Sequence, residues 1–578
     1  MPAPNSNSDS NQVAAAQIHW ALALLDGLIT AGVTTLVLSP GSRSTPVILA
    51  AQQRPTALAL IPILDERSAA FFALGHAQAR GAPVALLATS GSAPAHWYPA
   101  VIEASTANVP LVLLSADRPP ALQQFGANQT IDQTRLFGQF VREFHAPGLP
   151  ENSPAALKAA FALGLRAATR AKSPMPGPVH LNLAFAEPLV ADVLPRPEPP
   201  LLNEAGGFSE NGVRTAGDLH LPRGRGLIVC GAGDYATDCA AFLWQAAAQH
   251  GWPVLPDVLS GLRFGATAAG HAPANRIRSY DTLLRNPTLA AHLRPDWVLR
   301  LGRAPVSKVL TEWLRGVPAL LVSPDASWSD PTHDVRWCIH ATPAAVCRQL
   351  ATTPPQVAPE THQLNAWHTA EQRMTALMAE LLNEAHWCEA HCIQDLFNQL
   401  PPTDALLCAN SLPIRQLDTW TALPDLRPTA ALRVFGNRGV SGIDGQLSTL
   451  AGLNHAGQPT WGLIGDLSFC HDVSGLFLAP RFTRPLIIIN NGGGRIFDYL
   501  PQRQLTGLET LWRTPQQFDL SHLAKAFYLT HSLIDDRAHF QQLLMPKFAE
   551  LSQIAEVRID PEQSRAVHLD LWERVRTV

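Results

Sequence analysis

Four short apolar runs decide the fold of the first third of the chain: TTLVLSP at 34–40, ALALIPIL at 57–64, PVALLATS at 83–90 and PLVLLSADRP at 110–119. Helical patterns separate them, such as RSAAFFALGHAQARG at 67–81. Apolar strands alternating with helices predict a parallel sheet covered on both faces. Ligands of such sheets bind beyond the C-terminal ends of the strands. We therefore expect functional residues at 39–44, 65–67, 89–92 and 115–118.

The same alternation returns twice along the chain. The last segment has strand patterns DALLCANS at 404–411, ALRVFGN at 431–437, TWGLIGDLS at 460–468 and RPLIIINN at 484–491, and the middle segment begins with GRGLIVCGAGD at 224–234. Proline-rich stretches at 186–202 and 351–363 separate the segments, because proline disfavours regular structure. The sequence thus predicts an α/β protein with three doubly wound open-sheet domains, at 13–190, 205–350 and 364–578.

Composition excludes several classes of protein. Of 578 residues, 46% are apolar and 16% charged, and the formal net charge is −4, so the chain is neither disordered nor suited to nucleic acid as its main ligand. We see no apolar run of the roughly 20 residues that a membrane span needs, and no signal-peptide pattern at the start. We expect a cytoplasmic protein without a membrane span.

The most informative spacing joins Gly465-Asp466 at one strand end to Asn490-Asn491-Gly492-Gly493 at the next. A strand, turn, helix and strand fill the interval, so both ends can meet at one edge of the sheet. Carboxylate, amide and carbonyl oxygens suit Mg²⁺, whose remaining positions can take diphosphate oxygens. Glycines let the backbone approach phosphate. Either dipeptide alone is also typical of an ordinary Asp or Asn turn.

Together these residues resemble the diphosphate-binding motif of thiamine diphosphate enzymes, although Leu467 replaces the usual third-position glycine. Further stretches resemble one family within that class, the 2-succinyl-5-enolpyruvyl-6-hydroxy-3-cyclohexene-1-carboxylate (SEPHCHC) synthases of menaquinone biosynthesis, in which leucine follows the Gly-Asp pair. They are SPGSRSTP at 39–46, DERSAAFFALGHA at 65–77, TSGSAPAHWYPAVIEAS at 89–105, SADRPP at 115–120, GANQTIDQ at 126–133, NRGVSGIDGQLST at 437–449, GDLS at 465–468 and NNGGGRIFDYLP at 490–501.

The resemblance implies a thiamine diphosphate- and Mg²⁺-dependent transferase, with Mn²⁺ as an alternative ion. The implied reaction decarboxylates 2-oxoglutarate and adds the succinyl carbanion to isochorismate. Glu66 would hydrogen-bond the pyrimidine ring as the catalytic carboxylate, and Ile443 would support the folded cofactor. The other implied cofactor residues are Gly465, Asp466, Ser468, Asn491 and Gly493, of which Asp466, Asn491 and Gly493 would hold the metal.

Two dianionic substrates call for fixed cations, and arginine pairs with carboxylates in a bidentate way. The resemblance places 2-oxoglutarate near Ser411, Arg415 and Arg438. It assigns isochorismate to Ser42, Arg43, Arg118, Gln129 and Lys308. Phe497 and Leu500 would exclude water from the reacting centre. The family also implies a homo-oligomer, dimer or tetramer, with sites between subunits.

Two other interpretations stay open at the sequence level. Another thiamine diphosphate-dependent decarboxylase, or an acetolactate-type synthase, would share Glu66, Asp466 and Asn491 but would not need the arginines. A dinucleotide-binding protein would use the glycines of CGAGDYA at 230–236, but no clear acidic partner stands at the expected distance. We therefore expect the central domain to carry no cofactor.

Overall fold

The computed structural model describes residues 6–192, 219, 221–233, 235, 237–265, 272–324, 328–355, 361–423, 432–545 and 553–577. Contacts divide the chain into two compact units. Unit 1 comprises residues 1–209, 437–458 and 471–482, and unit 2 comprises residues 210–436, 459–470 and 483–578. Each unit is described below by itself.

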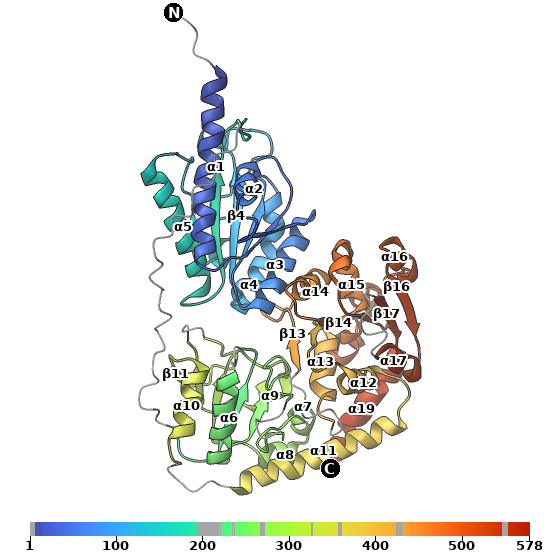
Figure 1. The fold of residues 1–578 in the computed structure, drawn as a ribbon. Coiled ribbons are helices and arrows are strands. Elements are labelled where there is room, and N and C mark those ends of the chain that lie inside the picture. Colours follow the sequence, from blue (N-terminus) through green and yellow to red (C-terminus); the bar gives the residue numbers. More distant parts are fainter. Residues whose placement is uncertain are drawn as a thin grey trace, which may run out of the picture. The chain divides into compact units, whose positions relative to one another are not determined.

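Unit 1 contains a six-stranded parallel sheet with the order β2-β1-β3-β4-β6-β5. Its strands are β1 (Thr35–Leu38), β2 (Ala59–Pro62), β3 (Val84–Ala88), β4 (Leu111–Asp117), β5 (Phe144–His145) and β6 (Pro178–Ala184). Helices α1 (Ser6–Thr30), α2 (Thr45–Ala51) and α5 (Pro154–Lys172) cover one face, and α3 (Glu66–Arg80) and α4 (Tyr98–Ala107) cover the other (Figure 1). The predicted apolar runs form β1 to β4.

Helix α1 is a core helix of this sheet. Among the described residues, one segment, Asn11–Thr30, is long and apolar enough to cross a membrane. Two thirds of that window, 67%, is buried inside the protein, where α1 packs along α5 and contributes Ile18, Leu25 and Leu28 to the core. Its apolar character is therefore explained by packing on the sheet.

The central sheet lies in unit 2 and has five parallel strands, in the order β11-β10-β9-β7-β8. They are β7 (Gly226–Cys230), β8 (Val254–Pro256), β9 (Trp297–Leu301), β10 (Ala319–Val322) and β11 (Val335–Ile339). The surrounding helices are α6 (Thr237–His250), α7 (Tyr280–Leu283), α8 (Pro287–His292), α9 (Lys308–Trp313) and α10 (Pro343–Thr352), and α11 (Thr361–Glu384) leads to the last sheet.

The last sheet has six parallel strands in the order β13-β12-β14-β15-β17-β16, the same succession as in the first sheet. They are β12 (Ala405–Cys408), β13 (Arg433–Phe435), β14 (Thr460–Gly465), β15 (Leu486–Asn490), β16 (Thr530–Ile534) and β17 (Gln553–Arg558). Its helices are α12 (Glu389–Gln399), α13 (Leu412–Trp420), α14 (Gln446–His455), α15 (Asp466–His471), α16 (Leu520–Ala526), α17 (Arg537–Leu543) and α19 (Pro561–Thr577). The prediction of three parallel open-sheet folds is confirmed.

Helix α14 follows a strand of the last sheet but belongs to unit 1, where it packs on α3 (Figure 1). The two helices approach through glycine on both sides. A β-carbon on Gly75 would collide with the carbonyl oxygen of Thr449, and one on Gly452 would collide with that of Phe72. The contact is reciprocal, and it requires residues without side chains because backbone meets backbone.

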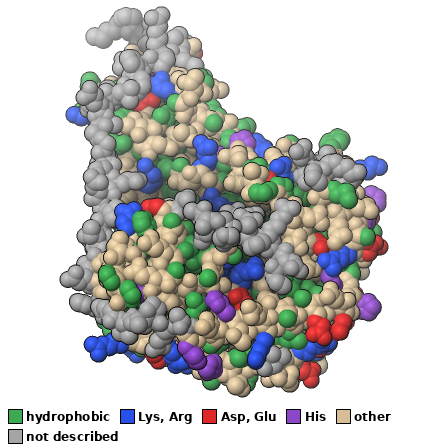
Figure 2. All heavy atoms as spheres, turned by 60° about the horizontal axis from the view of Figure 1, so that its bottom comes forward, with side chains coloured by type: hydrophobic (Ala, Val, Ile, Leu, Met, Phe, Trp, Pro, Cys, Tyr) green, Lys and Arg blue, Asp and Glu red, His purple; other side chains and the backbone are tan. Residues whose placement is uncertain are grey.

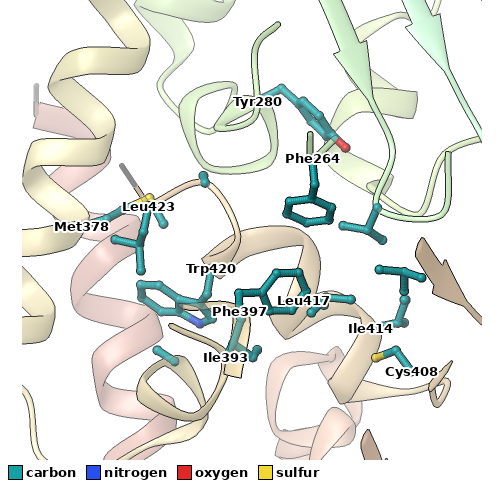
Figure 3. Packing of buried hydrophobic residues seen from close by; sticks show 14 of the residues in the cluster. Phe264, Tyr280, Met378, Ile393, Phe397, Cys408, Ile414, Leu417, Trp420 and Leu423 are labelled. Atoms are coloured by element: carbon teal, nitrogen blue, oxygen red, sulfur yellow. The ribbon is translucent and has the colours of Figure 1, made fainter. Parts of the chain in front are cut away.

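In unit 2 one apolar core joins the central and last sheets. Figure 3 shows Phe264 and Tyr280 from the central region facing Phe397, Leu417 and Trp420 from α12 and α13. All five are buried, and the rings of Phe264 and Phe397 lie 4.9 Å apart. This packing holds α13, whose first turn carries residues predicted to bind substrate.

Candidate active site

Glu66 is the first residue of α3, at the C-terminal edge of the first sheet. The preceding Asp65 caps the helix by accepting hydrogen bonds from the amides of Arg67 (2.9 Å) and Ser68 (3.4 Å). Burial alone would raise the pKa of Asp65, but hydrogen bonds from Ser474, Ser68 and Arg67 lower it. The ionised cap fixes the helix start, and with it the half-buried Glu66.

Two of the predicted arginines converge at the same edge of the first sheet. Arg43 is buried, with 7% of its surface exposed, and its guanidinium donates to Glu187 Oε1 and to the carbonyl oxygen of Phe185, both at 2.9 Å. Arg118 donates to Ser90 Oγ and, at 2.7 Å, to the carbonyl oxygen of Gln129. Burial and the charge of Arg43 lower the pKa of Arg118. The carboxylate of Glu187 partly offsets the repulsion between the two arginines.

A buried polar network supports Arg118 from beneath. Asp117 Oδ1 accepts from the Arg118 amide at 2.7 Å, and Asp117 Oδ2 accepts from Asn182 at 2.8 Å. Asn182 in turn accepts from Ser115 (2.8 Å) and Gln133 (2.7 Å). Burial raises the pKa of Asp117. Sequence reasoning missed Asn182 and Gln133. Asn182 is a polar residue inside the apolar pattern of β6, which could have signalled it, whereas Gln133 lies in a loop.

Gln129 and Ser42, also predicted to bind substrate, lie exposed at this edge. Gln129 has φ +53°, a conformation that side-chain-bearing residues rarely adopt, and its Nε2 donates to the carbonyl oxygen of Ser90 at 3.2 Å. Gly91, with φ +85°, faces Gln129 so closely that a β-carbon would lie 2.8 Å from its Cγ. Such strain often marks a binding loop.

In unit 2, Asp466 and the glycines after β15 do meet. Strands β14 and β15 are neighbours, with Gly465 opposite Ile489. Asp466 is 5% exposed, and its Oδ2 accepts from the Gly493 amide at 2.6 Å. Burial raises the pKa of Asp466, while backbone hydrogen bonds from Gly493, Leu467 and Gly492 lower it. Gly493, at φ +109°, has no space for a side chain, because Arg513 O fills it. Ser468 lies buried in α15.

Asn491 is 9% exposed, and its side chain is oriented by residues outside the motif. Its Nδ2 donates to Glu389 Oε1 at 3.3 Å, and the other oxygen of Glu389 accepts from Ser564 Oγ. Burial raises the pKa of Glu389. Sequence reasoning missed Glu389 and Ser564. It assigned no role to the C-terminal 77 residues, although Ser564 of α19 contacts Glu389.

Ser411 precedes α13, and its φ of +71° strains a residue with a side chain. Arg415 is exposed one turn later, and its Nη1 donates to the carbonyl oxygen of Ser411 at 2.6 Å. At the other end of the helix, the buried Trp420 donates to His568 Nε2 of α19 at 3.1 Å. The apolar side of α13 is thus fixed in the core (Figure 3), while Arg415 is exposed.

Three other predicted residues lie in unit 2: Phe497 and Leu500 follow β15, and Lys308 begins α9 beside the central sheet. Phe497 is half-buried and Leu500 is 39% exposed, after the glycines that follow β15. Buried Asp498 accepts from Arg513 Nε at 2.8 Å, which fixes this short turn. Lys308 is exposed at the first position of α9.

Arg438 and Ile443 lie with Glu66 in unit 1, in the loop that leads from β13 to α14. Both are half-buried. The loop ends at Gly445, with φ +64°, where a β-carbon would collide with the ring of Phe71 of α3. The predicted residues therefore divide into two sets: Ser42, Arg43, Glu66, Arg118, Gln129, Arg438 and Ile443 in unit 1, and Lys308, Ser411, Arg415, Gly465, Asp466, Ser468, Asn491, Gly493, Phe497 and Leu500 in unit 2.

The glycines of the central domain have a structural reason. A β-carbon on Gly231, after β7, would collide with the carbonyl oxygen of Arg303. Gly302, with φ +71°, lies against Ala232 and Tyr235. These glycines allow the close packing of backbone segments after β7 and β9. That the central domain carries no cofactor stays a prediction.

Comparison with known proteins agrees with this arrangement. The family model described as the N-terminal TPP binding domain of thiamine pyrophosphate enzymes matches residues 18–136, and that for the thiamine pyrophosphate middle domain matches residues 209–408. SEPHCHC synthase of Geobacillus kaustophilus is 37% identical over 576 residues, covering 96% of this chain and 97% of the relative. The chain belongs to the SEPHCHC synthase family. It is therefore a thiamine diphosphate-dependent enzyme.

Other members of the SEPHCHC synthase family support the assignment. The synthase of Chloroflexus aurantiacus is 38% identical and covers 96% of both chains. That of Dechloromonas aromatica is 38% identical, covering 89% of this chain and 94% of its own. The resemblance in the sequence motifs is confirmed. The roles of individual residues stay predictions, for which the geometry above supplies the physical argument.

Proposed function

We propose that this enzyme decarboxylates 2-oxoglutarate and adds the resulting four-carbon unit to isochorismate by 1,4-addition, giving the cyclohexene carboxylate and CO₂ in menaquinone biosynthesis. The observation that supports the proposal is the pair of arginines at the edge of the first sheet, Arg43 and Arg118, of which Arg43 also pairs with Glu187. A decarboxylase of simple 2-oxo acids needs no such pair, whereas a dianionic acceptor does.

The residues of unit 2 fit a diphosphate and a divalent cation. The donor set would be a carboxylate oxygen of Asp466, the amide oxygen of Asn491 and the carbonyl oxygen of Gly493, all hard ligands that suit Mg²⁺ or Mn²⁺. Asp466 is buried and Asn491 is anchored through its nitrogen, which leaves its oxygen to bind. The positive φ angles of Gly492 and Gly493 give a turn without side chains, of the kind in which backbone can approach a phosphate.

Thiamine diphosphate, when bound, supplies the electron sink for loss of CO₂. Glu66 would hold a proton between its carboxylate and the far nitrogen of the pyrimidine ring. Ile443 would support the folded cofactor, while Phe497 and Leu500 would exclude water. Arg415 and Arg438 would bind the distal carboxylate of 2-oxoglutarate beside Ser411. The set for isochorismate would be Ser42, Arg43, Arg118, Gln129 and Lys308.

The proposal includes a homo-oligomer in which each site draws on two subunits. Glu66 and Asp466 belong to different compact units of the chain. Unit 1 also exposes large apolar side chains, including Phe125 (81%) and Phe477 (70%), which a second copy would cover.

We place the enzyme in the cytoplasm. Figure 2 shows basic and acidic side chains interspersed on the face in view, as expected for an enzyme that does not bind nucleic acid.

Turnover with defined substrates tests the proposal. We expect purified enzyme with thiamine diphosphate and Mg²⁺ to release CO₂ rapidly and to form coupled product only when 2-oxoglutarate and isochorismate are both present. Mass spectrometry of the product and ¹⁴CO₂ release would measure this. Efficient consumption of pyruvate alone would contradict the proposal and favour an acetolactate-type enzyme.

A further inference from the structure

A carboxylate from α4 holds the loop that carries Arg438 and Ile443. Glu103 is 2% exposed, and its two oxygens accept hydrogen bonds from consecutive backbone amides of that loop. Oε1 accepts from Gly439 at 2.6 Å and Oε2 accepts from Val440 at 2.7 Å. These distances are short because a charged acceptor strengthens a hydrogen bond. The loop is therefore attached to α4 one residue after Arg438.

The loop backbone lies directly on α4 at this point. A β-carbon on Gly439 would lie 2.8 Å from the carbonyl oxygen of Glu103 and 3.0 Å from the amide nitrogen of Ala107. Contacts this close leave no room for a side chain. The glycine and the carboxylate thus serve one arrangement: the first allows the approach, and the second fixes it.

Other hydrogen bonds close the base of the loop. Asn437 Nδ2 donates to Thr449 Oγ1 at 3.0 Å, and Gln446 Nε2 donates to the carbonyl oxygens of Gly442 and Asp444, both at 3.2 Å. Between these points the chain has no helix or strand, and Val440 is 50% exposed. Glu103 therefore adds a contact between the two ends of the loop.

We infer that Glu103 is the positioning residue that sets Arg438 for the distal carboxylate of 2-oxoglutarate. This inference rests on the proposed function. Glu103 accepts hydrogen bonds from two consecutive amides and so orients the backbone of the residues that follow Arg438. Misplacement of a binding group by about 1 Å can cost on the order of 100-fold in rate. Loss of the anchor should therefore weaken recognition of the donor acid more than that of the acceptor.

The test compares Glu103→Gln with Glu143→Gln, the same chemical change at a carboxylate that pairs with Arg166 and His145 in the same unit. Glutamine keeps the shape of Glu103 but turns an NH₂ group toward an amide donor. We expect the KM for 2-oxoglutarate to rise about 10-fold or more, with the KM for isochorismate and the Kd for thiamine diphosphate within about twofold. Hydrogen exchange at residues 439–440 should accelerate. Glu143→Gln should change none of these.

A double-mutant cycle shows whether Glu103 acts through Arg438. In an Arg438→Ala background, Glu103→Gln should add little to the KM for 2-oxoglutarate. An unchanged KM in the single variant, or a full additional effect in the double variant, would overturn the inference. Glu103→Asp, which keeps the charge but reaches less far, should give an intermediate KM and serves if the glutamine variant does not fold. Failure of wild-type enzyme to couple the two acids would instead refute the proposed function, and hydrogen exchange would still test the anchor.

Discussion

The first and last sheets have the same strand succession, yet they carry different chemistry at equivalent places. After its second strand, the first sheet has Asp65 and Glu66 at the start of α3. After its second strand, the last sheet has Arg438 and Ile443 before α14. Beyond its third and fourth strands the last sheet has Asp466 and Asn491, where the first sheet has Ser90 and Arg118. One backbone plan thus presents different side chains at equivalent strand ends, and we propose the ring of a cofactor for one and its phosphates for the other.

The largest expected effect comes from a substitution at the edge of the first sheet. Glu66→Gln should reduce kcat by about 100-fold or more, because a neutral amide cannot share a proton with the pyrimidine ring as a carboxylate does. Cofactor affinity should change little, since the proposed ligands of the diphosphate and the metal, Asp466, Asn491 and Gly493, are unchanged. Stopped assays of CO₂ release and a fluorescence titration would measure both. A variant that kept more than a tenth of wild-type kcat would exclude Glu66 as the activating group.

The matching change in the last sheet is Asp466→Ala, which should abolish Mg²⁺-dependent retention of thiamine diphosphate. We expect the Kd to rise about 100-fold, because the diphosphate loses its bridging cation. Isothermal titration with and without EDTA measures this. Since burial raises the pKa of Asp466, metal-dependent binding should also weaken in mildly acid solution sooner than for an exposed carboxylate. Equal affinity with and without Asp466 would contradict the assignment.

The arginines sharpen the comparison by substrate. Arg415→Ala or Arg438→Ala should raise the KM for 2-oxoglutarate at least about 30-fold, which corresponds to about 2 kcal/mol. Arg43→Ala or Arg118→Ala should affect isochorismate instead. A lysine replacement should recover part of the loss, because it keeps the charge but not the planar fork. Kinetics with each acid varied in turn decide between these outcomes; a uniform effect of all four on isochorismate would refute the placement.

Substitution of the contact glycine in either α3 or α14 should lower the stability of the protein by a similar amount. Gly75→Ala and Gly452→Ala each force a methyl group onto a carbonyl oxygen of the other helix, and each should destabilise the protein by about 1–3 kcal/mol. Together they should cost less than the sum, because one separation of α3 and α14 relieves both clashes. Denaturant unfolding would measure this.

The smallest expected effect is a pH dependence at the same contact. Burial lowers the pKa of His76 to about 4, with repulsion from His455 and Arg80 adding to it, and burial also lowers the pKa of His455. A histidine whose pKa is lowered in the folded state does not affect stability at pH values above its unfolded-state pKa of about 6.5. As the pH falls from there toward 4, the free energy of unfolding decreases, because the unfolded state binds the proton more readily. After discounting for solvent, we expect about 1–2 kcal/mol. Thermal unfolding of His76→Asn should show a shallower loss over this window.

Local patterns predicted what depends on neighbours in the sequence. Short apolar runs gave β1 to β4 and the strands of the last sheet, and strand-end residues such as Asp466 and Gly493 were correctly expected to meet. The sequence could not predict that Glu103 holds a loop 336 residues away, or that Glu389 orients Asn491 across 102 residues. Such contacts depend on which elements pack together, and nothing in the composition of α4 or α12 distinguishes these glutamates from solvated ones.

Unit 1 also has a consequence for the order of events during synthesis. Glu103 accepts a hydrogen bond from the amide of Gly439, which is synthesised 336 residues later, and Arg67 donates to the hydroxyl group of Ser474, 407 residues later. At roughly 5–20 residues per second, the ribosome needs roughly 20–80 s to deliver those partners. During that interval the nascent N-terminal sheet has no α14 to cover α3, so the Phe72 and Gly75 face is bare to water and to neighbouring chains. The first unit therefore cannot be completed until residue 482 has been made, although the last strand of its sheet ends at residue 184.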